Sequence, residues 1–547
     1  VLRSVPAPVA RRLHADVAAH LQQHGGEPAR LAAHWEAAGR WGEARQALLA
    51  AAAAARAIGR FREQAALYER AASACEEAGD PAARFEMMLE RVQALIMGDE
   101  GDEALAAAAD LESEATSDQQ RLHAIACQVN LHGTRMDHEM ALSLGARGLP
   151  LAVRTGDHKA RLDLTCSMAY VLCTLRRTGE ALELMESLRD WVHREGQAVD
   201  RQHWTTHMAL VSTAAGRLRE AVRLHETSAA LAQELGLIPE LAMDYSNLAE
   251  TYSTMGLFEQ ALSWGQRAHG LIEQQQAGMV GRNLVGHARD LRNAGRFDEA
   301  LRCFERWHES LQSESSPVWR QVGAVWWAGL WVWLGQHARA LPLLQADDER
   351  GLERVRAMGW IYRAQAQRAL GQAWHDSLRR AGEICPDTSG SALALPLAQL
   401  PLASPEAALQ TTVEIGRLAR ESERTSVLMH ARLCEAEAAA ARGLKAQVMT
   451  AAQDALHWLA QGYAPDASLY RGEFFLRLWR ALLAAGHAET AERALHLGGA
   501  WLQDKALPHV PPPFIESFLH RNPANRELLA ALGAQGAQGV QGSLPRA

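Results

Sequence analysis

The sequence predicts an all-α fold, a solenoid of repeated helical hairpins wound into a right-handed superhelix. Apolar residues recur at helical spacing almost throughout, and the good helix formers Ala, Leu, Arg, Glu and Gln dominate, whereas alternating β-branched runs are lacking. A short phrase built around a glycine also recurs. Its copies at Gly216, Gly256, Gly295 and Gly335 are spaced by 40, 39 and 40 residues. Although 547 residues would ordinarily form several globular domains, this period makes the chain one array.

Each copy of the phrase predicts a turn between two helices. Glycine adopts a positive φ without strain and so ends the first helix, and an acidic residue that follows favours the start of the second. Weaker copies stand at Gly59, Gly179, Gly371 and Gly443. Alanine usually stands seven residues before the glycine, where a small side chain lets the two helices approach closely. These alanines are Ala32, Ala209, Ala249, Ala288, Ala328, Ala364 and Ala436.

This arrangement of glycine and paired alanines is similar to the tetratricopeptide repeat (TPR) pattern. The segment around Gly256 fits the pattern best, with Ala249 before the glycine and Ala261 after it. HEAT repeats have a similar period, but the glycine turn favours the TPR interpretation. Because ordinary TPR repeats have ~34 residues, each helix here should be about one turn longer.

Changes in regularity along the chain predict five parts. Residues 382–405 are rich in Pro, Ser and small residues, and the end of the chain is of low complexity. The predicted parts are a junction with the first hairpins (1–75), the main superhelix (76–381), a linker (382–405), C-terminal hairpins (406–507), and a Pro-rich motif with a flexible tail (508–547).

Charge and cysteine content exclude several classes of protein. The chain has 56 Lys and Arg against 64 Asp and Glu, a net charge of −8, so direct binding to nucleic acid is not expected. The sequence contains no run of about 18 uncharged apolar residues, so no membrane span is predicted. The 7 cysteines form no CxxC pair, which favours reduced thiols and a cytoplasmic location.

Two segments resemble a family of large proteins. Near the start, Pro28–Gly39 reads PARLAAHWEAAG and leads into an Ala-rich helix at 50–55. Near the end, Val510–Leu519 reads VPPPFIESFL, followed by RNPANRELL at 521–529. Both resemble the region after the nucleotide-binding and winged-helix domains of bacterial STAND-type signal-transduction ATPases. Relatives of that family include the maltose-regulon activator, SARP-type transcriptional regulators and cyclase-fused ATPases.

The resemblance implies a regulatory role. No GxxxxGK[ST] phosphate loop occurs in the 547 residues and the first residue is Val1, so the ATPase module, its ATP and any effector module are expected upstream. This segment would then be the TPR sensor that binds a protein, peptide or small-molecule effector in a concave groove and contacts the ATPase domain of the same chain. The alternative is a free-standing TPR scaffold that binds peptide or protein partners in the same groove.

Catalytic and metal-binding motifs are not apparent. No HExxH, G-x-S-x-G or Gly-rich nucleotide loop is present, so we expect no enzyme activity and no cofactor in this segment. His20 and His24 stand four residues apart, but no third ligand has suitable spacing, and no metal site is predicted.

Candidate binding residues follow from the helix positions that face the groove in the TPR pattern. An arginine column at 282, 289 and 292 could clamp a carboxylate or phosphate, or could be a solvated face with salt bridges. The candidates from this pattern are Ser246, Glu250, Arg282, Arg289, Arg292, Asn293, Gln365 and Arg368.

Tryptophan is concentrated in one short region. Eight of the 16 Trp lie between Trp307 and Trp374, and those before Gly335 form two helical stripes. Core packing explains such stripes, and an aromatic wall of the groove is the alternative. On the second interpretation Trp326 and Trp333 join the binding candidates.

Overall fold

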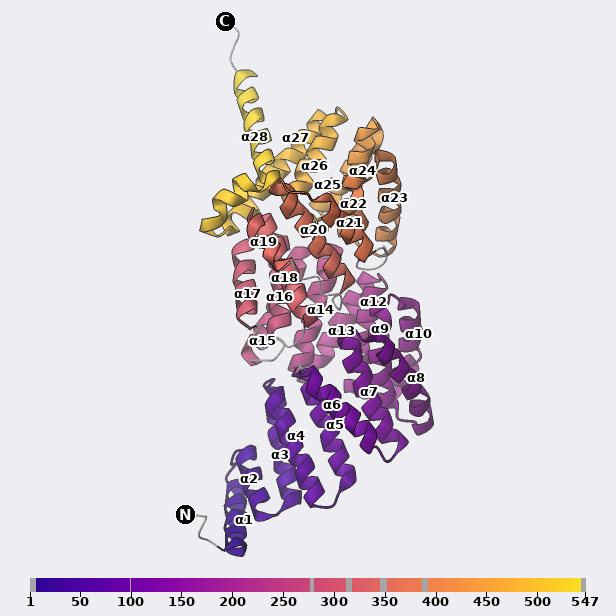
Figure 1. The fold of residues 1–547 in the computed structure, drawn as a ribbon, viewed down its shortest axis with the longest axis vertical. Helices are drawn as coiled ribbons and strands as arrows, with labels where there is room; N and C mark the ends of the chain where they lie inside the picture. Colours follow the sequence, from indigo (N-terminus) through magenta and orange to yellow (C-terminus); the bar gives the residue numbers. More distant parts are fainter. Residues whose placement is uncertain are drawn as a thin grey trace. The chain divides into compact units, whose positions relative to one another are not determined.

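The computed structural model describes residues 6–98, 100–275, 280–310, 317–344, 352–385 and 392–542, and these are helical with no strand among them (Figure 1). The prediction of an all-α solenoid is confirmed, because the helices form repeated TPR-like hairpins. The first eleven helices are α1 (Ala7–Gln23), α2 (Pro28–Ala38), α3 (Trp41–Ala57), α4 (Phe61–Glu77), α5 (Pro81–Met97), α6 (Gly101–Glu114), α7 (Asp118–Thr134), α8 (His138–Thr155), α9 (His158–Thr174), α10 (Thr178–Glu186) and α11 (Arg189–Arg194).

The rest of the chain consists of longer α-helices and, from residue 400 onward, several short 3-10 and π-helical segments. The longer ones are α12 (Ala198–Ala214), α13 (Leu218–Glu234), α14 (Ile238–Met255), α15 (Phe258–Gln275), α16 (Val280–Ala294), α17 (Phe297–Ser310), α18 (Pro317–Trp333), α19 (His337–Leu343), α20 (Glu353–Ala369), α21 (His375–Ile384), α22 (Leu395–Gln399), α23 (Pro405–Glu421), α24 (Thr425–Ala441), α25 (Lys445–Ala460), α26 (Arg471–Ala484), α27 (Ala488–Ala500) and α28 (Pro523–Gly542). The short segments are η3 (Leu400–Leu402), η4 (Trp501–Ala506), η5 (Leu507–His509), η6 (Pro512–Phe514) and η7 (Ser517–Arg521).

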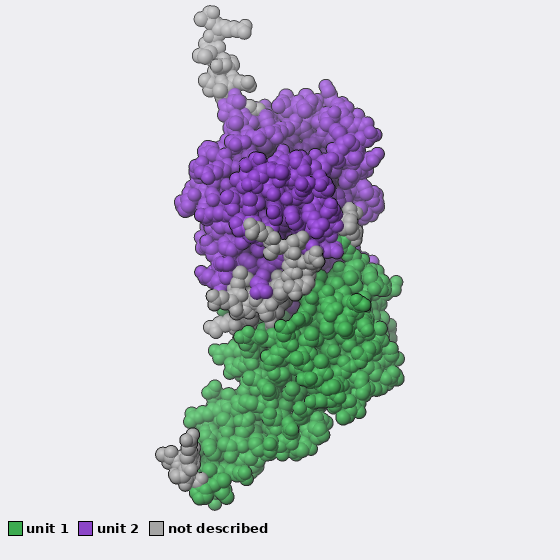
Figure 2. All heavy atoms as spheres, viewed as in Figure 1, with its two compact units in different colours: residues 1–207, 228–242, 270–280 green, residues 208–227, 243–269, 281–547 purple. Residues whose placement is uncertain are grey.

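The chain forms two compact units, coloured green and purple in Figure 2. Unit 1 comprises residues 1–207, 228–242 and 270–280. Unit 2 comprises residues 208–227, 243–269 and 281–547. Within unit 1, each helix from α1 to α10 packs on its neighbour in sequence, and α5 packs on α7 and α7 on α9. The same two-step pattern recurs in unit 2, where α18 packs on α20 and α24 on α26. First helices of successive hairpins thus pack on one another, as in a TPR array.

The predicted turns and small contact positions are confirmed at the regular repeats. Gly256 has a φ of 89°, and a Cβ there would lie 2.6 Å from the carbonyl oxygen of Ala464. Only glycine satisfies both constraints. The alanines seven residues before the turns are all buried: Ala32, Ala209, Ala249, Ala288, Ala328, Ala364 and Ala436.

Some turns do not use glycine. Gly179 was expected at a turn but lies within α10, and the residue with positive φ is Arg176 at 61°. Met136 and Glu423 also have positive φ, at 65° and 53°. The backbone conformation of the hairpin turn is therefore kept where its glycine is replaced, at the strain that a side chain incurs in this region.

Two of the predicted parts, 382–405 and 508–547, contain helical elements over the residues that the structure describes. In the predicted linker 382–405, α22 and η3 form, and Leu393 and Leu397 are buried in a core cluster with Ile415. Beyond 508, α28 is a helix to Gly542, and Leu528 within it is fully buried. In the predicted linker, buried apolar residues therefore outweigh the Pro and small-residue composition.

Two further properties, membrane-spanning potential and the state of the cysteines, are given for the part of the chain that the structure describes. None of its helices is both long enough and apolar enough to cross a membrane. All seven cysteines are free thiols, and Cys173 alone among them is more than slightly exposed.

Candidate functional site: an arginine cluster in unit 2

A cluster of charged side chains lies within unit 2. Its residues come from α14, α16 and α20, from the residue that precedes α24, and from the loop between α25 and α26. We call it the arginine cluster, and its members are Glu250, Arg289, Asp290, Arg292, Arg354, Arg424 and Asp466.

Arg292 is the most enclosed member, with none of its surface exposed. Its Nη1 donates to the Tyr362 hydroxyl at 2.8 Å. Its Nη2 donates to Oδ1 of Asn293 at 2.8 Å and to the carbonyl of Ala467 at 3.1 Å. Burial lowers the pKa of Arg292. Since all three guanidinium nitrogens donate to protein atoms, Arg292 and Asn293 hold α16, α20 and the loop together, and the prediction that they face an open groove is wrong.

The tryptophan candidates belong to the same interior. Trp326 and Trp333 are each 4% exposed, and the guanidinium carbon of Arg292 lies 4.9 Å and 4.1 Å from their ring centres. These distances are those of cation–π interactions. The core interpretation of the two tryptophans is therefore confirmed, and they do not form the wall of an open groove.

Arg289 and Glu250 connect this interior to solvent. Arg289 is 8% exposed, donates to Oδ1 of Asp290 at 2.8 Å and 3.0 Å, and pairs with Glu250. The side chain of Glu250 remains 44% exposed. Burial alone would raise the pKa of Glu250, but Arg289, Arg354 and Arg424 outweigh that effect and lower it. The carboxylate is thus ionised, accessible and surrounded by cations.

Asp290 is the buried counterpart of Glu250. It is 2% exposed, and burial raises its pKa to about 6, although Arg289 opposes the rise. The exposed Glu250 adds to the rise because two carboxylates that share one arginine repel each other. At neutral pH the carboxylates of Glu250 and Asp290 are both ionised. Together they balance the positive charge of Arg289.

Arg424 and Arg354 carry the unbalanced charge. Arg424 is 5% exposed, and its Nε is buried without a hydrogen-bond partner. Burial, with the like charge of Arg354, lowers the pKa of Arg424 to about 10. Neither guanidinium pairs with a carboxylate within 4 Å among the residues that the structure describes. A buried cation without a salt-bridge partner is costly, and the charged form of Arg424 is favoured only at longer range, by Asp466 and Glu250.

Local structure holds Arg424 and Asp466 in place. Glu423, at positive φ, turns the chain so that Arg424 lies at the start of α24. The loop before α26 is fixed to neighbouring turns, because Ala464 N donates to the carbonyl of Gly256 at 2.9 Å and Asp466 N to that of Ser426 at 3.1 Å. Asp466 is half-buried and favours the charged form of Arg424.

The arginine cluster is positive although the chain is negative. Four arginines face three carboxylates, Glu250, Asp290 and Asp466. Arginine forks recognise carboxylates and phosphates through paired hydrogen bonds. An anionic group that entered beside Glu250 would meet the unpaired donors of Arg424.

The other predicted site residues lie apart from these contacts. Ser246 is one turn before Glu250 on α14 and accepts a hydrogen bond from Asn283 at 3.1 Å. Gln365 is half-buried on α20, and the exposed Arg368 lies 5.3 Å from the ring of Trp374. The side chain of Arg282 lies outside the described residues.

The sequence analysis did not identify Arg424, Asp466 and Arg354 as site residues. No glycine turn nearby shows which of these positions face the cluster. Arg424 follows Glu423, which replaces the turn glycine, and Asp466 lies in a loop. Arg354 lies at the start of α20, well before Gln365, which is the first residue of that helix among the predicted candidates. Residues in these places could be found only by tracing which positions oppose α16 in space.

A separate surface pocket of about 470 Å³ lies elsewhere in unit 2, between the α12–α13 and α23–α24 turns. Its charged lining contains three arginines and three glutamates. Arg219 N donates to Glu423 at 2.7 Å, and Arg217 lies 3.7 Å from Glu220. Because its charges are balanced, this pocket lacks the unpaired cation that marks the arginine cluster.

Comparison with known proteins identifies a repeat family in part of the chain. Residues 201–274 match the tetratricopeptide repeat family, and this segment covers α12–α15 except for a few terminal residues. These residues therefore form a tetratricopeptide repeat region, which includes Ser246 and Glu250. A search of curated proteins gave no match.

Several solved structures are similar to the chain. A Rap protein complexed with competence and sporulation factor is 13% identical, with 62% of this chain and 98% of that chain covered and a TM-score of 0.48. A signal transduction ATPase with numerous domains (STAND) protein with a tetratricopeptide repeat sensor, from Pyrococcus horikoshii, is 13% identical, with 71% and 54% covered and a TM-score of 0.37. Yeast Tom70 is 12% identical, with 78% and 95% covered and a TM-score of 0.33.

Proposed function

We propose that this chain is a ligand- or partner-binding TPR region that captures an anionic group at the arginine cluster. The observation that carries the proposal is Arg424, a buried cation whose Nε has no partner. The exposed Glu250 marks the side from which a ligand enters, and Arg354 supplies a second guanidinium without a carboxylate partner. A peptide carboxylate satisfies both arginines through paired hydrogen bonds.

The regulatory role that we propose follows from the resemblance to STAND-type ATPases. In that role the segment is the sensor of a multidomain bacterial, cytoplasmic protein. Ligand binding changes its contact with an upstream ATPase domain, which holds the ATP and controls a transcriptional or signalling module. The segment itself is not an enzyme, and the match of residues 201–274 to the tetratricopeptide repeat family supports the choice of a peptide or protein ligand.

The ligand class is tested with two peptide pools of the same random sequences, one with free C-terminal carboxylates and one with amidated C-termini. Immobilised protein should retain the free-carboxylate pool in preference to the amidated one. For peptides recovered and measured by calorimetry, Arg424→Gln and Arg354→Gln should each raise the Kd at least about tenfold. Arg302→Gln, at an exposed position on α17, is the matched control. Equal retention of both pools would contradict the proposal.

The alternative is a free-standing TPR scaffold with the same carboxylate specificity. The coding sequence upstream of Val1 separates the two roles. A GxxxxGK[ST] motif there, in a reading frame continuous with this chain, supports the sensor role. A start codon directly before Val1 supports the scaffold.

A further inference from the structure

A second group of chemically reactive side chains lies in unit 1, between α9 and α12. Cys166 lies on α9, and His203 and His207 are four residues apart on α12, which places both imidazoles on one face of that helix. One ligand atom from each of the three residues lies within 4.8 Å of the other two. Asp163 is one turn before Cys166 on α9, and its Oδ1 lies 3.3 Å from Nδ1 of His203.

The contacts of the two imidazoles leave one nitrogen of each ring for a ligand. Nδ1 of His207 donates to the carbonyl of His203 at 3.0 Å, and Nδ1 of His203 lies against Asp163. Nε2 of each ring is free of these contacts. Metal-bound histidines usually have their second nitrogen held by an oxygen in this way.

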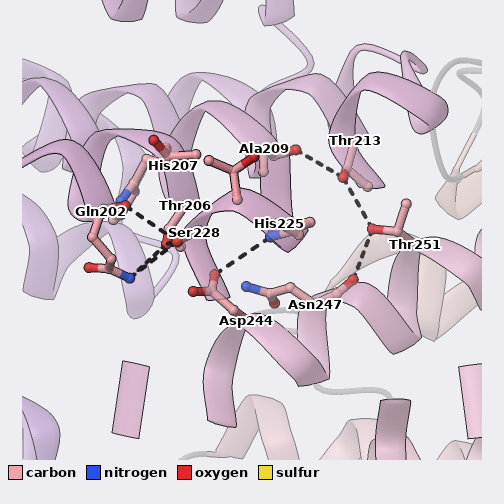
Figure 3. Close-up of polar contacts among 12 residues, drawn as sticks. Gln202, Thr206, His207, Ala209, Thr213, His225, Ser228, Asp244, Asn247 and Thr251 are labelled. Atoms are coloured by element: carbon pink, nitrogen blue, oxygen red, sulfur yellow. Dashed lines mark hydrogen bonds and ion pairs between the residues drawn. The ribbon is translucent and has the colours of Figure 1, made fainter. Parts of the chain in front are cut away.

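The surroundings of α12 hold the two histidines in position. Gln202 and Thr206, on the same helix, both bond to the hydroxyl of Ser228 on α13, at 3.2 Å and 2.5 Å, and all three residues are buried (Figure 3). Figure 3 shows His207 on α12 next to this set. Cys166 is 1% exposed, whereas 35% of the His203 side chain is exposed, so the group combines a buried ligand with one that is accessible to solvent.

We propose that Cys166, His203 and His207 bind Zn²⁺, with Asp163 as the residue that positions His203. One thiolate and two imidazoles are a ligand set for zinc and other soft or borderline ions, not for Mg²⁺ or Ca²⁺. Three protein ligands leave the fourth tetrahedral position for water or for an incoming ligand. In a zinc site with bonds of about 2.0–2.3 Å, the ligand atoms are roughly 3.3–3.8 Å apart, so small side-chain rotations close the site.

Binding of the ion forms a Zn–S bond and releases the proton of the Cys166 thiol to solvent.

Sequence spacing conceals this site. The two donors on α12 and the donor on α9 are separated by about one repeat, so they meet only when first helices of successive hairpins pack together. The zinc ion would join two hairpins of unit 1 and stabilise that unit by an amount that increases with the logarithm of the ion concentration.

The test uses the full chain after removal of metals with a chelator, and the probes are Zn²⁺ and Co²⁺ alone. Zinc is titrated in competition with a chromophoric chelator, and cobalt binding is followed by its absorption. We expect one tight site per chain and, with Co²⁺, a sulfur-to-metal charge-transfer band that reports the thiolate directly. Absence of a stoichiometric site, or a cobalt complex without that band, would overturn the proposal.

Variants separate this site from binding by surface histidines. Cys166→Ser should remove the charge-transfer band and weaken zinc binding more than about 100-fold, and His207→Gln should weaken it comparably. Asp163→Asn should keep the band and weaken binding about 10–100-fold, as expected of a positioning residue. Cys173→Ser, on the same helix, is the matched control and should change neither. Wild-type affinity in Cys166→Ser or His207→Gln would show adventitious binding and reject the site.

Discussion

Two regions of the chain have similar helical hairpins but different interiors. In α2–α5, which we call the alanine region, the interior consists mainly of small apolar residues such as Ala44, Ala52 and Ala71. Its ion pairs lie at the surface, as between Arg70 and Glu36, whose side chains are 40% and 26% exposed. In α16–α20, arginine is buried among tryptophans and carboxylates. The alanine region shows what the repeat needs in order to fold, so the buried charges of the arginine cluster require a further explanation.

The largest difference between the regions should appear when an arginine of each is removed. Arg292→Ala leaves a cavity and removes the donors to Tyr362 and Ala467, so we expect a loss of about 3–5 kcal/mol in the unfolding free energy. Arg70→Ala, its counterpart in the alanine region, should cost less than about 1 kcal/mol, since its ion pair with Glu36 is partly solvated. Urea unfolding followed by circular dichroism measures both. Similar losses would remove the distinction between the regions.

A second difference concerns pH. Burial lowers the pKa of His287, on α16, to about 4, so the folded chain binds its proton less readily than the unfolded chain does. The stability it contributes is present above about pH 6.5 and is lost as pH falls toward 4, by about 3 kcal/mol. His287→Gln should flatten the dependence of the unfolding free energy on pH in this window. Exposed His457→Gln is the control, and an unchanged slope in His287→Gln would refute the assignment.

The smallest expected difference concerns packing. A Cβ on Gly329, in α18, would lie 2.4 Å from Nη1 of Arg292 and 2.7 Å from Cζ of Tyr362. Gly329→Ala should therefore cost about 1–3 kcal/mol. Gly42→Ala, in α3 of the alanine region, meets no atom within 4 Å and should be neutral or stabilising by less than about 1 kcal/mol. Thermal unfolding of the two variants compares them, and a stable Gly329→Ala would show that the interior of unit 2 is loosely packed.

Some features of the fold and of the arginine cluster could be predicted from the sequence, and others could not. The glycine turns and the alanines seven residues before them follow from local backbone and packing rules, which operate within one hairpin, so they were predictable. Arg289 and Glu250 were found because their register follows from the turns at Gly295 and Gly256. Arg424 and Arg354 were not, because their relation to α16 depends on helices far apart in the sequence.

The burial of Arg292 could not be predicted either. Nothing in the sequence distinguishes its position from an exposed one three residues before a turn. Its enclosure depends on the loop residue Ala467 and on Tyr362, which lie 175 and 70 residues away. The tryptophan stripe at Trp326 and Trp333 had both interpretations open until the position of that guanidinium was known.

The most direct test of the account is the unfolding free energy of Arg424→Met in the chain without ligand. On the proposal that Arg424 binds an external anion, its replacement by an apolar residue should leave the unliganded chain as stable as the wild type or stabilise it by about 1–3 kcal/mol. The same substitution at Arg292, whose donors are all used within the fold, should destabilise it. A loss of stability in Arg424→Met as large as that in Arg292→Met would show that Arg424 is a structural residue and would contradict the assignment of the arginine cluster as a binding site.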